Sequence, residues 1–391
     1  MTSRVVGIQS RVLQWARERA GYSLDDIALA MGKDVAVIEA WEKGEDAPTY
    51  VQLEKLAYQF YKRPIAVFFF PEPPSEPDLK KSFRTLPEFE IDALAADTRY
   101  ALRYAQAMQL SLRELNEGVN PAQRKIFSDI RLERGVNLNQ IAVKVREYLG
   151  TSLDDQIRWK SEEDALKTWR EKIEEVGVFV FKRAFKQEDI SGFCLLDVEF
   201  PIIYVNNSNA KTRQTFSLFH ELAHILFQIN GISKWDDRYI EYLPENERRI
   251  EEFCNRFAGE FLVPSRDFDM QIRGLKADDA SVEALASRYK VSREVILRKF
   301  LDRGLVDRTY YESKAAQWTK EYLEAKDKLE SSGGDYYRTQ ATYLGDKYLG
   351  LVFGKYFQGR LSLEQVADYL GVKTKSVSGL EHVYMSKAVP A

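Results

Sequence analysis

The chain has three histidines, and two of them stand four positions apart. His220 and His224 belong to the segment Phe219-His220-Glu221-Leu222-Ala223-His224. On a helix, residues four apart lie on one face about one turn apart, so both imidazoles can bind one metal ion. Glu221 follows the first histidine, where its carboxylate can take a proton from a metal-bound water. The pattern predicts a Zn²⁺ site with Glu221 as the catalytic base.

A catalytic zinc ion needs a third protein ligand and leaves one position open for water. Residues 249–258 are predicted to form a second helix, which places Glu251 and Asn255 on one face. We expect Glu251 to be the third ligand and Asn255 to accept the free ring N–H of a ligand histidine. Other carboxylates remain as rivals for the third position: Glu252, Asp236 and Asp237.

The other residues near these motifs have simpler interpretations. Cys254 is expected to be a small buried core residue, and His382 is expected to lie outside the site. The group that would stabilise an oxyanion is left open among Arg213, Tyr239 and Tyr242.

The elements that must position these residues are mostly helical. Short β-branched or aromatic runs interrupt the helical spacing at residues 178–181, 192–196 and 202–205. We interpret them as a small antiparallel sheet, and we expect a substrate strand to pair with the edge that includes Ile202–Val205. Gly231 is expected to end the helix that carries His220 and His224.

Composition bounds the class of protein. The 57 Lys and Arg nearly balance the 60 Asp and Glu, so nucleic-acid binding would require a local basic patch. Two cysteines cannot build a disulfide framework and indicate a reducing compartment. No apolar run approaches the ~18–20 residues of a membrane span, and the N-terminus does not have the pattern of a signal peptide. We expect a cytoplasmic protein without a membrane partner.

Together, the motifs resemble those of the ImmA/IrrE metallopeptidases, in the longer form with an N-terminal Xre-type helix-turn-helix. The resemblance rests on Arg213-Gln214-Thr215-Phe216 before the histidine motif and on residues 251–264, which read Glu-x-x-Cys-Asn-x-Phe-Ala and then Glu-Phe-Leu-Val-Pro. Residues 282–294 also resemble the family, whereas Phe253 and Cys254 depart from the acidic residue and alanine frequent there.

The resemblance implies a fold and an activity. It implies a thermolysin-like minimal zincin core with zinc on His220, His224 and Glu251, and Glu221 as general base in a gluzincin-like HExxH motif. It also implies regulated cleavage of helix-turn-helix repressors, or an antitoxin-like role beside a toxin.

Prolines and glycines suggest the domain boundaries. Five of the twelve prolines fall between Pro64 and Pro77, and Ser-Ser-Gly-Gly occupies residues 331–334. The predicted fold class is α+β, mostly α-helical. We expect an Xre-type helix-turn-helix bundle at 1–70, a proline-rich linker with connecting helices at 71–130, an ImmA/IrrE-like peptidase domain at 131–305 and a C-terminal helical segment at 306–391.

The N-terminal helix-turn-helix segment lacks the chemistry expected of a DNA reader. The presumed recognition helix at 34–42 carries Val, Ala and acidic residues where Arg, Lys, Asn or Gln would contact bases. We therefore assign no DNA-binding residue and favour protein docking or homodimerisation. The stretch 362–377 also resembles a helix-turn-helix and is interpreted as a partner or packing element.

The leading hypothesis is a zinc-dependent endopeptidase that cleaves a partner regulatory protein of the repressor or antitoxin type. Its setting would be a stress response, a mobile element or a toxin–antitoxin system. The alternatives are a non-proteolytic, antitoxin-like protein that neutralises a toxin, and an autoregulating transcription factor that binds DNA.

Overall fold

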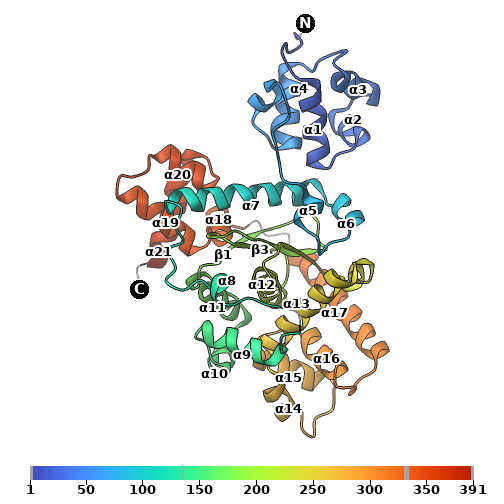
Figure 1. Ribbon diagram of the computed structural model, residues 1–391, viewed down its shortest axis with the longest axis vertical. Helices are drawn as coiled ribbons and strands as arrows, with labels where there is room; N and C mark the ends of the chain where they lie inside the picture. Colours follow the sequence, from blue (N-terminus) through green and yellow to red (C-terminus); the bar gives the residue numbers. More distant parts are fainter. Residues whose placement is uncertain (1–2, 134, 330–333, 389–391) are drawn as a thin grey trace. The chain divides into compact units, whose positions relative to one another are not determined.

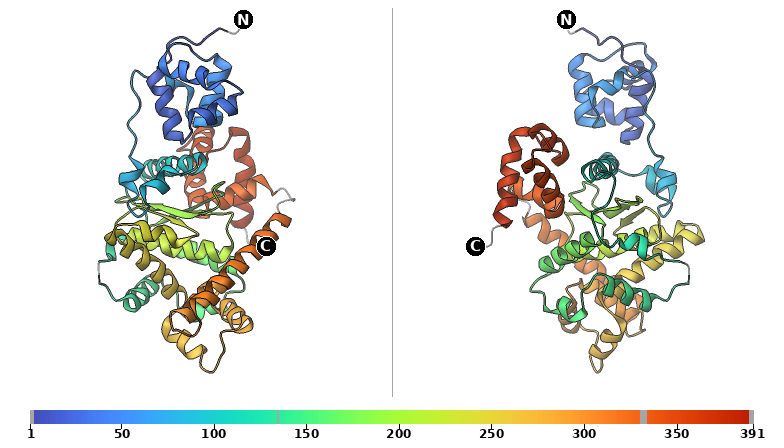
Figure 2. Two further views of the ribbon diagram at one scale, coloured as in Figure 1. Left: turned by 90° about the vertical axis from the view of Figure 1, so that its right-hand side faces the viewer. Right: turned by 60° about the vertical axis from the view of Figure 1, so that its left-hand side comes forward.

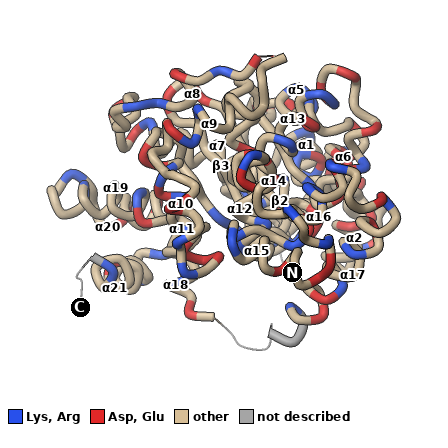
Figure 3. Tube along the Cα trace, turned by 90° about the horizontal axis from the view of Figure 1, so that it is seen from below, with Lys and Arg blue, Asp and Glu red and all other residues tan. Residues whose placement is uncertain are grey.

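The computed structural model describes residues 3–133, 135–329 and 334–388 (Figure 1). The described chain forms two compact units. One contains the residues up to Gln106 together with Phe185–Glu188, and the other contains Ala107–Ala184 and the chain from Asp189 onward. No helix among these described residues is long and apolar enough to cross a membrane. Basic and acidic residues are interspersed along the chain (Figure 3).

The first unit begins with a helix-turn-helix bundle. Its elements are α1 (Ser10–Ala20), α2 (Leu24–Met31), α3 (Val35–Lys43), α4 (Tyr50–Lys55), the π-helix η1 (Leu56–Tyr61) and the 3-10 helix η2 (Ile65–Phe69). Ser23 and Asp26 form a capping box that starts α2, and Gly32 ends the helix in the left-handed conformation. Ile27, Ile38 and Trp41 bury the faces of α2 and α3 in a shared core. The short helices α5 (Leu79–Ser82) and α6 (Glu88–Asp92) follow.

The second unit is mostly helical around one small sheet. The connecting helix α7 (Ala96–Leu115) leads into it. The helices before the sheet are α8 (Ile126–Asp129), α9 (Leu138–Tyr148), α10 (Leu153–Arg158) and α11 (Glu162–Glu175). Those that follow the third strand are α12 (Lys211–Leu226), η3 (Asp237–Tyr242), α13 (Glu245–Leu262), α14 (Ser265–Gln271), α15 (Asp279–Tyr289), α16 (Arg293–Leu301) and α17 (Arg308–Leu329).

The sheet has four strands, β1 (Phe179–Arg183), β2 (Ile190–Leu195), β3 (Ile202–Asn206) and β4 (Gly231–Lys234), in the order β1-β3-β2-β4. β2 is antiparallel to both of its neighbours, whereas β1 and β3 are parallel. The predicted α+β, mostly helical class is confirmed, but the sheet is mixed rather than wholly antiparallel.

Two further expectations about the sheet are wrong. Ile202–Val205 lies in β3, which is bonded on both sides and offers no free edge. Gly231 does not end the histidine helix, because α12 ends at Leu226 and Gln228 takes the left-handed turn. Gly231 instead begins β4, an edge strand that the short Gly-Ile-Ser-Lys run did not reveal.

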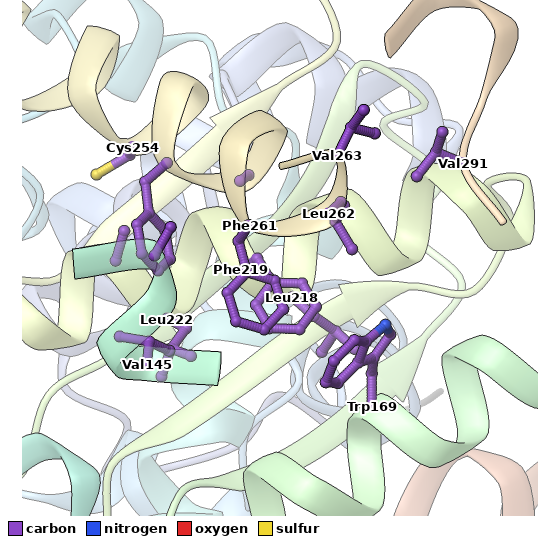
Figure 4. Packing of buried hydrophobic residues seen from close by; sticks show 14 of the residues in the cluster. Val145, Trp169, Leu218, Phe219, Leu222, Cys254, Phe261, Leu262, Val263 and Val291 are labelled. Atoms are coloured by element: carbon purple, nitrogen blue, oxygen red, sulfur yellow. The ribbon is translucent and has the colours of Figure 1, made fainter. Parts of the chain in front are cut away.

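The core of the second unit joins α12 to its neighbours. Phe219 of α12 stacks on Phe261 of α13 with ring centroids 4.0 Å apart, and Trp169 of α11 meets both rings edge-on (Figure 4). Cys254 is fully buried in the same cluster, as expected. This aromatic packing fixes α12 and α13 relative to each other, which matters because both helices carry site residues.

The C-terminal helices complete the second unit (Figure 2). They are α18 (Tyr336–Leu344), α19 (Asp346–Phe357), α20 (Leu363–Leu370), the 3-10 helix η4 (Thr374–Ser376) and α21 (Val377–Ala388). α18 packs against β1, and Tyr348 of α19 meets Phe181 of β1 edge-on. The β1 edge is therefore covered by the chain's own helices.

Candidate metal centre

α12 is buried along almost its whole length, and it presents His220, Glu221 and His224 beneath the sheet. α13 crosses beside it and contributes Glu251. The side chains of His224, Glu221 and Glu251 are fully buried and His220 is nearly so. Three of these residues, His220, His224 and Glu251, bring one ligand atom each within 4.8 Å of the others.

The separations between these atoms fit a tetrahedral metal ion. The two Nε2 atoms of His220 and His224 are 3.0 Å apart, and the Glu251 carboxylate oxygens lie 3.3 and 3.2 Å from them. Ligands bound at ~2.0–2.1 Å in a tetrahedron are separated by about 3.3 Å. Glu251 Oε1 is buried without a hydrogen-bond partner among the described residues. The three side chains therefore fit a zinc ion.

Electrostatics keeps the third ligand ionised. Burial tends to raise the pKa of Glu251, but His224 and His220 outweigh it and the pKa is lowered. Burial likewise tends to lower the pKa of His224, and the Glu251 carboxylate reverses the direction. The buried carboxylate of Glu251 therefore favours the protonated form of the His224 imidazole.

An outer layer of polar groups orients His220. Asn255 Oδ1 lies 2.9 Å from His220 Nδ1, the ring nitrogen turned away from the ligand cluster. Asn255 Nδ2 in turn donates to Asp237 Oδ2 at 3.2 Å. Burial raises the pKa of the Asp237 carboxyl, and Arg213 acts against that rise. The structure thus places Asn255 where the sequence suggested, with Asp237 behind it.

The remaining predicted residues lie elsewhere. Glu252 is exposed, and Asp236 caps η3 and pairs with Arg238, so neither joins the ligand atoms. Tyr242 and His382 are also exposed.

Two of the residues considered for the oxyanion hold the site together. Tyr239 donates its hydroxyl to Glu251 Oε2 at 3.2 Å, and burial raises its pKa well above the usual value. Arg213 donates to Ser191 Oγ and to the Lys234 carbonyl, at 3.2 and 2.8 Å, and so ties α12 to β2 and β4. A small pocket opens at this point, lined by Arg213, Phe216, Ser217, His220, Ser233, Lys234, Asp237, Tyr239 and Asn255.

Glycine at position 231 is a site feature that the sequence reasoning missed. A Cβ built there would lie 2.4 Å from His224 Cδ2 and 2.9 Å from Glu221 Oε2. Both contacts are too short for any side chain, so β4 can pass this close to the site only with glycine. A glycine seven residues after the second histidine, at the start of a short polar–apolar run, was the available signal.

Comparison with known protein families agrees with this geometry. Residues 173–301 match the peptidase family M78 model, described as the IrrE N-terminal-like domain, and residues 13–58 match a helix-turn-helix model. The first segment contains all four strands together with α12 and α13, and the second begins in α1 and ends in η1. A search of curated proteins found no match. The predicted combination of an ImmA/IrrE-type peptidase with an N-terminal Xre-type helix-turn-helix is confirmed for these two segments.

Proposed function

We propose, on the premise that residues 173–301 form an IrrE N-terminal-like peptidase domain, that this protein is a zinc-dependent endopeptidase. Its substrate would be a partner regulatory protein of the repressor or antitoxin type, in a stress-response, mobile-element or toxin–antitoxin setting. The observation that carries the proposal is the convergence of His220, His224 and Glu251 beside the fully buried carboxylate of Glu221.

Each residue of the site has its own role in the proposed peptide hydrolysis. His220, His224 and Glu251 would hold zinc, which supplies Lewis-acid polarisation of the scissile carbonyl and of the attacking water. Glu221 accepts the proton of that water on a carboxylate oxygen and returns it to the leaving amine. Asn255 keeps His220 in the tautomer that leaves Nε2 free.

The substrate strand is proposed to pair with β4. β3 and β2 are bonded on both sides, and the C-terminal helices cover β1. β4 starts at Gly231, against Glu221, and Ser233 and Lys234 line the small pocket beside His220. A peptide added to this strand would pass the general base.

Metal analysis and cleavage test the proposal in sequence. Elemental analysis of the wild type is expected to give about one zinc per chain, and Glu251→Ala and His224→Ala should each lose it. Glu221→Gln should retain zinc but abolish hydrolysis in a library of internally quenched peptides. A metal-free wild type, purified without chelators, would count against the peptidase and favour a binding protein that neutralises its partner.

The helix-turn-helix unit is proposed to recognise a protein rather than an operator. Arg17 binds Glu42 through two contacts of 2.7 and 2.8 Å, so this acid of α3 belongs to the packing of the bundle and does not face DNA. The start of α3 still presents Val35 and Ala36 in place of base-reading donors. A salt-dependent shift of the promoter DNA of its own gene would contradict protein docking and favour the autoregulator.

The state of the two cysteines bears on the cellular compartment. Both cysteines, Cys194 and Cys254, are free and buried. We propose a cytoplasmic location, since thiols of this kind persist where the environment is reducing.

A further inference from the structure

The carboxylate of Glu221 occupies the space left by the missing side chain of Gly231. A Cβ on Gly231 would lie 2.9 Å from Glu221 Oε2. Glu221 is fully buried, and no hydrogen bond of standard geometry reaches either carboxylate oxygen from the residues that the structure describes. A general base must have a defined orientation, so the question is which neighbour supplies it.

Strand pairing places Cys194 beside Gly231, on the side of the sheet that faces Glu221. Cys194 of β2 lies directly opposite Gly231 of β4. Residues paired in this way point to the same face of a sheet, with Cβ atoms ~4.5–5.5 Å apart. The Gly231 Cβ position faces Glu221, so the Cys194 side chain shares that face with the carboxylate. Cys194 is fully buried, and the charge of Glu221 contributes to the raised pKa of its thiol.

The thiol of Cys194 is available as a donor. Burial first, and the Glu221 charge next, raise the pKa of Cys194 well above its usual value, so the sulfur keeps its proton. Its other acceptor is the Ile229 carbonyl oxygen, at 3.9 Å from Sγ. A carboxylate is a stronger acceptor than a carbonyl oxygen.

We propose that the Cys194 S–H donates to the Glu221 carboxylate and makes Cys194 a positioning residue for the general base. The inference rests on the proposed function, because it assigns Glu221 the role of base. It gives the thiol a structural task in the site without contact to substrate or metal.

The S–H stretching band in the infrared spectrum tests the contact without substrate or metal. In the full-length Cys254→Ala variant, Cys194 is the single thiol. Its band should lie at lower frequency than that of an unbonded thiol and should move to higher frequency when Glu221→Gln is added. A band that stays in place would overturn the proposal. The matched control is Cys194→Ala, in which the remaining Cys254 band should respond far less to Glu221→Gln, because Glu221 acts on that thiol through its charge alone.

Comparison of Cys194→Ala with Cys194→Ser shows whether Cys194 acts by donating to Glu221 or only by filling space. In zinc-loaded protein, Cys194→Ala should lower kcat by roughly 10-fold with little change in KM, and Cys194→Ser should restore most of kcat because its hydroxyl donates. Equal loss in both variants, with the fold intact by circular dichroism, would overturn the positioning role. If the wild type cleaves nothing, the proposed function fails, and the infrared result still decides the Cys194–Glu221 contact.

Discussion

At the scale of single residues, the site depends as much on a missing side chain as on those present. Gly231 allows the edge strand to lie against His224 and Glu221, two side chains that are themselves fully buried. Neither can withdraw without losing its place at the ligand cluster. The metal site and the start of β4 therefore constrain each other.

We predict that Gly231→Ala damages metal binding. The new methyl group would displace the His224 ring, so zinc affinity should fall roughly 10–100-fold, and stability should fall by about 1–3 kcal/mol through overpacking. Competition with a fluorescent chelator and urea unfolding measure the two effects. The control is Gly259→Ala in α13, where a Cβ meets no atom within 4 Å and helix propensity should raise stability slightly. Unchanged zinc affinity in Gly231→Ala would contradict the geometry.

A single buried residue, Lys182 of β1, is expected to make the stability of the protein depend on pH. Burial, together with Arg170 and Lys211, lowers its pKa from 10.5 to about 7. Between these two values the unfolded chain binds the proton more tightly, so this residue makes stability rise as the pH is raised from about 7 towards 10. Lys182→Met should flatten that rise and stabilise the protein at pH 7. Urea unfolding at several pH values measures the slope, and Lys186→Met, at an exposed lysine, should leave it unchanged.

At the scale of elements, buried polar contacts attach the C-terminal helices to the sheet. Arg170 of α11 donates to the carbonyls of Thr342 and Val180 and pairs with Glu174 at 3.2 Å. Lys347 of α19 donates to the Glu174 carbonyl. Because β1 is an edge strand, these contacts protect an edge that would otherwise be open to pairing with another chain.

We predict that Gly345→Ala releases this attachment. Gly345 has φ +84°, and a Cβ there would lie 2.0 Å from Arg170 Nη2, so the substitution adds a clash to backbone strain. Stability should fall by more than 3 kcal/mol, and limited proteolysis should cut near α18. Gly359→Ala is the control, because Gly359 has φ +70° and no atom within 4 Å of its Cβ position. It should lose only the ~1–3 kcal/mol of backbone strain, and equal losses would contradict a role for Arg170.

At the scale of the whole molecule, the proposed metal would stabilise one of the two units. All the proposed ligands lie in the second unit, and the helix-turn-helix bundle has a core of its own. A ligand that binds only the folded state adds about 2.7 kcal/mol when its concentration is 100 times Kd. The consequence for unfolding is therefore confined to the unit that holds the ligands.

Calorimetry of the full chain should show two transitions, of which one responds to zinc. Addition of a chelator is expected to lower the unfolding temperature of the second unit. The unfolding temperature of the helix-turn-helix unit should not change. His224→Ala should behave like the chelated wild type and be insensitive to further chelation. A single transition that shifts as a whole would show instead that the two units unfold together.

The sequence by itself determined which residues share one face of a helix. The spacing of His220 and His224, and that of Glu251 and Asn255, follows from the local period of a helix, which needs no knowledge of distant contacts. Short β-branched or aromatic runs likewise located three of the four strands, and helical spacing of apolar residues indicated the mostly helical class.

The tertiary structure decided everything that depends on pairing between distant segments. Strand order buried Ile202–Val205 in the sheet interior and made Gly231–Lys234 an edge strand, because hydrogen bonding between strands is not encoded in the local pattern of either strand. The same non-local contacts placed Asp237 behind Asn255, Tyr239 on Glu251, and Cys194 opposite Gly231. The sequence suggested other roles for Asp237, Tyr239 and Gly231 and none at the site for Cys194, and packing alone gives each of them its place there.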